Sequence, residues 1–358
     1  MRGRDAHEHG AAGLANPIPR DLLFVPWEAL YAKPFVGITT DGSVHPDLFK
    51  LAPDRAPITP MVDAAAALLR ELPAESRSAL CLPIDAGEWR RWNNTEMYTC
   101  KHGLRLDEVT DSVRDAVLAI VKASLSEPGF EKTRNVMRVN HFLGELVGNT
   151  RVLGEWSFNF TLFGSPSTSD PWGWQLAGHH LALNCLVVAG QMTLTPMFMG
   201  AEPTYIDTGP HAGTRLFQDE ENFGLALMGA LSAEQRREAV LYYDNVGGDL
   251  PAGRRHRADQ LHLGGAFQDN RIIPYEGVVA SRFNARQRSR LLDLVEAFIL
   301  PLPAGPQAAR MDEIEKHLAE TRFCWIGGTG ENDTFYYRIQ SPVVMIEFDH
   351  HSLSLIHI

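Results

Sequence analysis

Apolar residues recur at helical spacing in several stretches of the chain. Between residues 107 and 124, positions 109, 113, 117, 120 and 121 are all valine or isoleucine and form one stripe. This pattern predicts an amphipathic helix that packs its stripe against a core. Similar patterns predict further helices over residues 61–72, 75–82, 130–146, 216–231, 233–243, 286–299 and 310–321.

Aromatic and β-branched residues are concentrated in three runs between Trp156 and Pro203. Turn-forming clusters at residues 164–173 and 189–191 separate these runs, which predicts a three-stranded antiparallel meander. Two further strands around a glycine-rich loop, and a third after Ser341-Pro342, are predicted near the end of the chain. The sequence therefore predicts an α+β fold, in which a mixed or mainly antiparallel sheet is covered by amphipathic helices.

Composition and charge narrow the class of protein. The 358 residues are 44% hydrophobic and 22% charged, as in a globular protein, and the formal net charge of −11 argues against a nucleic-acid partner. No stretch has the apolar length of a signal peptide or a membrane span, so a cytoplasmic protein with a small-molecule partner and no membrane partner is expected. Residues 1–16 lack periodicity and are predicted to form a disordered tail. The sequence leaves the oligomeric state open.

The middle run of the meander contains the adjacent residues His179 and His180. On one continuous strand, alternation places His180 and Asn184 on one face and His179 on the other. His180 is then a candidate metal ligand or general base. The alternative is that both histidines are structural polar groups of the core.

The last predicted strand places Glu347 and Asp349 on one side. If this strand lies near His180, the two carboxylates complete a site for a divalent cation, which Glu202 could join. Alternatively, Glu347 and Asp349 pair with Arg338 or Arg282 at a sheet edge.

Several long segments resemble the family catalogued as domain of unknown function 3500, which occurs in fungi and bacteria. They are FTLFGSPSTSDPWGWQLAGHHLALN, TPMFMGAEP, NRIIPYEGV, ARQRSRLLDLV and TRFCWIGG followed by FYYRIQSPVVMIEFDHH. The resemblance covers roughly residues 17–351 and implies that they form a single domain; it implies no activity. Family members continue into a further strand, so residues 352–358 are expected to be a foreign tail derived from adapter or vector sequence. Loss of that strand is expected to expose a sheet edge.

Two hypotheses about function follow. The first is a metal-dependent hydrolase or lyase that acts on a small polar or carbohydrate-like substrate. Its catalytic residues are His180 and Glu347, and its cofactor is zinc, manganese or iron. The metal ligands are His179, His180, Glu202 and Asp349, and the substrate-binding residues are Trp172, Trp174, Asn184, Tyr337 and Arg338.

The second hypothesis is a non-catalytic small-molecule or sugar-binding protein that stacks its ligand on exposed aromatic rings (Trp89, Trp92, Trp172, Trp174, Tyr336 and Tyr337). A purely structural protein is less favoured, because polar groups on interior strands cost about 1–3 kcal/mol each unless they are satisfied.

Overall fold

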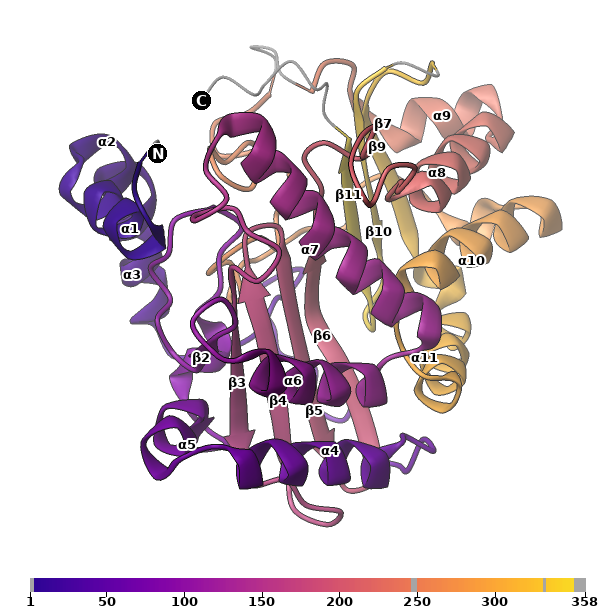
Figure 1. The fold of residues 1–358 in the computed structure, drawn as a ribbon. Helices are drawn as coiled ribbons and strands as arrows, with labels where there is room; N and C mark the ends of the chain where they lie inside the picture. Colours follow the sequence, from indigo (N-terminus) through magenta and orange to yellow (C-terminus); the bar gives the residue numbers. More distant parts are fainter. Residues whose placement is uncertain (1–2, 246–249, 331–332, 351–358) are drawn as a thin grey trace. The chain divides into compact units, whose positions relative to one another are not determined.

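The computed structural model describes residues 3–245, 250–330 and 333–350. The chain divides into two compact units, each with its own sheet (Figure 1). The first unit comprises residues 1–33, 51–216 and 301–307, and the second comprises residues 34–50, 217–300 and 308–358. Both sheets are mixed and mostly antiparallel, so the predicted α+β class is confirmed. The assignment of residues 17–351 to a single domain stays a prediction, and the predicted foreign tail at 352–358 lies outside the described residues.

The first unit contains a six-stranded sheet in the order β1-β3-β4-β5-β6, with β2 pairing to β3. Only the β1–β3 pair among these strands is parallel. Strands β3 to β6 form the predicted meander, but the middle run is two strands rather than one. The bounds are β1 (Cys81–Leu82), β2 (Leu104–Arg105), β3 (Phe158–Gly164), β4 (Trp172–Gly178), β5 (Leu181–Val188) and β6 (Gln191–Met199).

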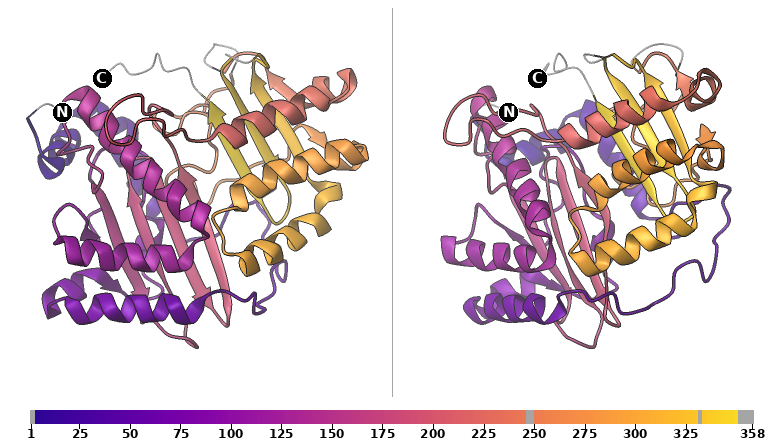
Figure 2. Two further views of the ribbon diagram at one scale, coloured as in Figure 1. Left: turned by 45° about the vertical axis from the view of Figure 1, so that its right-hand side comes forward. Right: turned by 90° about the vertical axis from the view of Figure 1, so that its right-hand side faces the viewer.

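Helices cover one face of this sheet. Figures 1 and 2 show α4, α6 and α7 on the same side of the strands. The apolar stripe predicted for residues 107–124 is buried in α6, where Val117 and Ile120 have no exposed surface. The bounds are α4 (Ile58–Glu71), α5 (Ala74–Leu80), η2 (Gly87–Arg90), α6 (Asp111–Ser124) and α7 (Glu127–Val147).

The N-terminal segment differs from the sequence prediction. Helix α1 (Ala6–Ala15) lies within the residues for which disorder was predicted, and it begins with a capping box in which Asp5 and Glu8 each bond the other's backbone N–H. Short helical segments continue the chain, and Trp27 buries its ring in the first unit. Their bounds are α2 (Pro17–Pro19), η1 (Arg20–Phe24) and α3 (Val25–Tyr31). Capping and tertiary packing stabilise a segment whose periodicity is weak.

The second unit contains a five-stranded sheet in the order β11-β10-β9-β7, with β8 pairing to β9. Its strands are β7 (Val240–Tyr242), β8 (Val278–Val279), β9 (Arg322–Gly327), β10 (Phe335–Gln340) and β11 (Met345–His350). Its helical segments are α8 (Gln218–Ala230), α9 (Ala233–Ala239), η3 (Ala280–Arg282), α10 (Ala285–Ile299) and η4 (Leu318–Glu320), while α11 (Ala304–Lys316) begins in the first unit and ends in the second. The helix predicted over residues 233–243 ends at Ala239, because the following Val-Leu-Tyr run pairs as β7.

Helices α8 and α10 cover one face of the second sheet (Figure 2). Tyr337 of β10 marks this face, since its hydroxyl donates to the carbonyl of Glu220 in α8 and its ring meets Phe298 of α10 edge to face. A side chain at Gly224 would approach the Tyr337 ring to 2.5 Å, so α8 can pack this closely only with glycine there. No helix in the described ranges combines the length and apolar character needed to cross a bilayer.

Candidate metal centre

The two adjacent histidines form a hairpin turn in the first unit. Gly178 pairs with Leu181, so His179 and His180 are the two residues that connect β4 to β5. His180 has a φ of 56°, the left-handed conformation that reverses the chain. The prediction that the two side chains point to opposite faces of a strand is therefore wrong. Their rings lie together, with centroids 3.8 Å apart and planes inclined by 32°.

The ring of His179 is oriented by a residue of α7. Its Nδ1 lies 2.8 Å from Oδ1 of Asn140. The amide nitrogen of Asn140 donates to the carbonyl of Gly154 at 2.8 Å, which leaves the amide oxygen facing the histidine. The amide oxygen of Asn140 can only accept a hydrogen bond, so Nδ1 of His179 carries the proton and Nε2 carries the lone pair.

The ring of His180 is oriented in the same way. Its Nδ1 lies 2.6 Å from Oδ1 of Asn94, and its Nε2 lies 3.4 Å from Oε2 of Glu202. The Asn94 oxygen accepts the Nδ1 proton, so Nε2 is the nitrogen that faces the Glu202 carboxylate. Glu202 follows β6, close to the end at which β6 pairs with the start of β5.

His179, His180 and Glu202 can each offer one ligand atom, and these atoms all lie within 4.8 Å of one another. Within residues 3–245, 250–330 and 333–350, no other set of three or more histidines, cysteines or carboxylates is grouped this closely. All three side chains are partly buried. Imidazole nitrogen with carboxylate oxygen is a ligand combination that zinc, manganese and iron accept.

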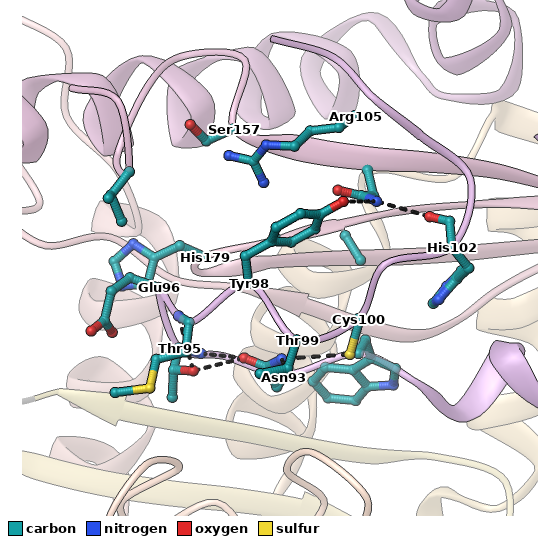
Figure 3. Close-up of a pocket in the computed structure, with 16 residues that line it drawn as sticks. Asn93, Thr95, Glu96, Tyr98, Thr99, Cys100, His102, Arg105, Ser157 and His179 are labelled. Atoms are coloured by element: carbon teal, nitrogen blue, oxygen red, sulfur yellow. Dashed lines mark hydrogen bonds between the residues drawn. The ribbon is translucent and has the colours of Figure 1, made fainter. Parts of the chain in front are cut away.

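A pocket opens beside this cluster in the first unit, with His179 in its wall (Figure 3). Its lining combines apolar surface with polar side chains, which include Glu96, Tyr98 and Asn159. The amide of Asn159 donates to the Tyr98 hydroxyl at 3.2 Å, and the guanidinium of Arg105 lies 4.4 Å from the centre of the Tyr98 ring. Polar groups thus converge next to the metal-ligand candidates.

The electrostatic environment favours a neutral His179. Its enclosure by protein atoms, together with the charge of His180, holds the pKa of His179 well below its ordinary value of 6.5. The ring is therefore neutral near pH 7, and neutral imidazole is the form that binds metals.

The aromatic residues predicted to form a ligand-stacking surface are buried. Trp172, Trp174, Tyr336 and Tyr337 have no exposed surface, and Trp92 is only 6% exposed. The prediction that these rings are exposed is wrong, because each lies inside its own unit. The indole nitrogen of Trp174 donates to Oγ of Ser124 at 2.9 Å.

Asn184 is also buried. Its amide oxygen accepts from Gln175 at 2.7 Å, and its amide nitrogen donates to the carbonyl of Pro196 at 2.8 Å. Both groups of its side-chain amide thus have internal partners, and the predicted role of Asn184 in substrate binding stays a prediction.

Glu347, Asp349, Tyr337 and Arg338 belong to the second unit. Glu347 accepts from the backbone of Leu263 and Gly264, both at 2.8 Å, and from the Tyr336 hydroxyl at 2.5 Å. Asp349 accepts from the backbone nitrogen of Leu261 at 2.8 Å. That these carboxylates share a site with His180 stays a prediction.

The arginines proposed as alternative partners of these carboxylates bond elsewhere. Arg338 is 1% exposed and donates to Glu276 and to the carbonyl of Pro274. Arg282 bonds to Glu234 and Glu238. The carboxylates of β11 therefore do not rely on the arginine pairs that the sequence suggested.

Four residues near the cluster were not identified from the sequence: Asn94, Asn140, Glu96 and His9. His9 could have been noticed, since Asp5 and Glu8 have capping-box spacing and predict a helix that includes it. The two asparagines carry no local signal, because they reach the histidines from 86 and 39 residues away in the chain.

A family model described as a protein of unknown function, DUF3500, matches residues 54–358. The match includes all three candidate ligands and begins after α3. Neither the curated proteins nor the solved structures contain a significant match to the chain.

Proposed function

The chain belongs to the DUF3500 family, and we propose that it is a metal-dependent hydrolase or lyase acting on a small polar or carbohydrate-like substrate. Zinc, manganese or iron would be held by His179, His180 and Glu202. One observation carries the proposal: each imidazole directs Nδ1 to an asparagine oxygen, and the two histidines and Glu202 each bring one ligand atom within 4.8 Å of the others.

The arrangement has the parts that metal sites require. A histidine that binds a metal through one ring nitrogen normally donates a hydrogen bond from the N–H of its other nitrogen to an oxygen. This bond fixes the tautomer and the ring orientation. Asn140 and Asn94 provide these oxygens. Three protein ligands leave coordination positions open for water and substrate, and a cation bound there would act as a Lewis acid and activate water.

The pocket supports a small polar substrate. Its wall offers the Tyr98 hydroxyl, the Asn159 amide and the Glu96 carboxylate within one recess. The charge of Arg105 is already balanced by Asp107, whose carboxylate lies 2.8 Å from Nε of Arg105. A neutral, hydroxyl-bearing molecule therefore suits this lining better than a strongly anionic one.

The competing hypothesis, a binding protein that stacks its ligand on exposed aromatic rings, has less support than the metal-dependent enzyme. It requires exposed rings, whereas Trp172, Trp174, Tyr336 and Tyr337 are fully buried. Trp89 is already stacked on Phe163, with ring centroids 3.8 Å apart.

Metal binding is the first test of the proposal. The full chain is stripped of metal and titrated with Zn²⁺, Mn²⁺ and Fe²⁺ under anaerobic conditions, and bound metal is measured by elemental analysis. We expect one equivalent to bind, and His180→Gln or Glu202→Gln to weaken binding at least about 100-fold, since even outer partners of metal ligands contribute 10–100-fold. His141→Gln is the control, because this partly exposed histidine lies on α7 beside Glu145 and outside the candidate ligand group. No stoichiometric metal, or equal affinity in all variants, would overturn the proposal.

Turnover is tested next with the loaded protein. Small esters and neutral glycosides are the hydrolase probes, and methyl-esterified uronic-acid disaccharides, which carry no charge, are the lyase probes. Turnover that depends on added metal and disappears in His180→Gln is the expected result. A rate that is the same with and without metal would contradict it.

A further inference from the structure

Glu96 approaches the candidate metal centre through the segment that orients His180. Asn94, whose oxygen accepts from His180, lies two residues before Glu96. Glu96 and His179 both line the pocket, and Figure 3 shows the two side chains at the same end of it. A second carboxylate is therefore presented to the space beside the two histidines.

Glu96 is held in place by a histidine of α1. Nε2 of His9 lies 3.1 Å from Oε1 of Glu96. His9 is only 8% exposed, so water competes little for this contact. Its Nδ1 is also buried and, among the described residues, has no hydrogen-bond partner. The ring is committed to Glu96, at the cost of leaving its second nitrogen unsatisfied.

Helix α1 is closely packed on the segment that contains Glu96. A side chain at Gly10 would come within 2.4 Å of the carbonyl oxygen of Tyr98, and one at Gly13 would come within 2.5 Å of the sulfur of Met97. The absence of side chains at these two positions lets the helix backbone approach residues 97 and 98. His9 is thereby placed directly over Glu96.

We infer that Glu96 is a second carboxylate of the metal centre and that His9 is its positioning residue. Helix α1, which lies outside the family match at residues 54–358, then forms part of the site. The inference rests on the proposed function. When a divalent cation is bound, the two histidines coordinate it as neutral imidazoles. Together with Glu202 they leave one uncompensated positive charge, which Glu96 balances from outside the group of three direct ligands.

The ionisation of Glu96 is consistent with this role. Burial raises its pKa, but the hydrogen bond from His9 and the charges of His9 and His180 outweigh burial, and the pKa lies below the ordinary value. Glu96 is therefore a carboxylate at neutral pH.

The test compares two histidine–glutamate pairs on the same helix. His7 also contacts a glutamate, with its Nε2 2.5 Å from Glu108 Oε1, but that pair is about half exposed and Glu108 does not line the pocket. Zn²⁺ affinity is measured by chelator competition for the unmodified full chain and for Glu96→Gln, His9→Gln, Glu96→Asp, His7→Gln and Glu108→Gln. The melting temperature of each metal-free protein is measured in parallel.

We expect Glu96→Gln and His9→Gln to weaken Zn²⁺ binding about 10- to 100-fold, because the first removes and the second misplaces a negative charge close to the cation. Glu96→Asp should recover part of the loss, and the His7 and Glu108 variants should change the melting temperature without changing affinity. If the Glu96 and His9 variants bind like the His7 and Glu108 variants, α1 only supports the fold and the inference is overturned. If the unmodified chain binds no Zn²⁺, Mn²⁺ or Fe²⁺, the proposed metal site fails first and this inference fails with it. Should Glu96→Gln not fold, Glu96→Asp and His9→Gln decide the matter.

Discussion

Nδ1 of His179 lies 2.8 Å from Oδ1 of Asn140, across the gap between a hairpin turn and a helix of the first unit. Replacing Asn140 with the similarly shaped leucine removes the acceptor that fixes the histidine tautomer. We expect Zn²⁺ affinity to fall about 10- to 100-fold. Unfolding by urea should show a loss of about 1–3 kcal/mol, because the carbonyl of Gly154 and His179 Nδ1 each lose a partner. Asn135→Leu on the same helix is the control, and unchanged affinity in Asn140→Leu would contradict the prediction.

Ser124 is expected to stabilise the core through Trp174. Its hydroxyl accepts from the buried indole and donates to the carbonyl of Ile120 at 2.8 Å. Ser124→Ala leaves the indole N–H without a partner, so the free energy of unfolding should fall by about 1–3 kcal/mol. Ser78 makes the same bond to its own helix, to the carbonyl of Ala74, but is exposed. Ser78→Ala should therefore cost less, and equal losses would refute the assignment.

Glu347 is expected to matter for stability in the second unit. Two backbone N–H groups and the Tyr336 hydroxyl donate to its two oxygens. Glu347→Gln places an amide N–H against one of these donors, so we expect a loss of about 1.5–3 kcal/mol in urea unfolding at pH 7. The exposed Glu315 of α11 provides the control, Glu315→Gln. A fully stable Glu347→Gln variant would point away from a structural role and back to the catalytic one.

His102 is expected to make the protein less stable in mild acid. Burial lowers its pKa below the ordinary 6.5, and a hydrogen bond with Gln175, at 2.8 Å from its Nε2, opposes the shift only partly. Below pH 6.5 the unfolded chain therefore binds a proton that the folded chain does not, and stability falls by up to about 1.4 kcal/mol per pH unit until the folded pKa is reached.

In the variant His102→Gln, the free energy of unfolding should no longer include this dependence on pH. Urea unfolding at pH 7.5 and 5.5 measures this dependence, with His141→Gln, at a partly exposed histidine, as the control. The prediction fails if His102→Gln and the unmodified chain lose the same free energy between these two pH values.

Most helices and strands were predictable, because the spacing of apolar residues along the sequence reflects which side chains are buried. The apolar stripe that ends with Ile120 and Val121 lies on α6 in the structure. The runs predicted as strands beside the two histidines and around Tyr337 also form strands. The turn at His179 and His180 was missed, although the run over residues 174–188 is much longer than a typical strand of five or six residues. That length was the available sign of a chain reversal.

The surroundings of the candidate site were not predictable in the same way. Asn140 and Asn94 reach the histidines only because α7 and the loop at residues 93–102 pack beside the hairpin, and no local pattern encodes that approach. Helices were predicted to cover the sheet, but the alternation of a strand does not show which of its residues they bury, so the full burial of Trp172 and Trp174 was not predicted. Helix α1 was missed because small residues give it little periodicity, while glycine is what its close packing requires.

The attachment of α1 also affects the order of folding during synthesis. His9 meets a residue 87 positions later in the chain, and Asp5 meets Arg151, 146 positions later. At about 5–20 residues per second, these partners leave the ribosome roughly 4 to 30 s after the helix does. A ten-residue helix is marginal by itself in water. Helix α1 is therefore synthesised before the residues that hold it, and it can become ordered only after those residues have been made.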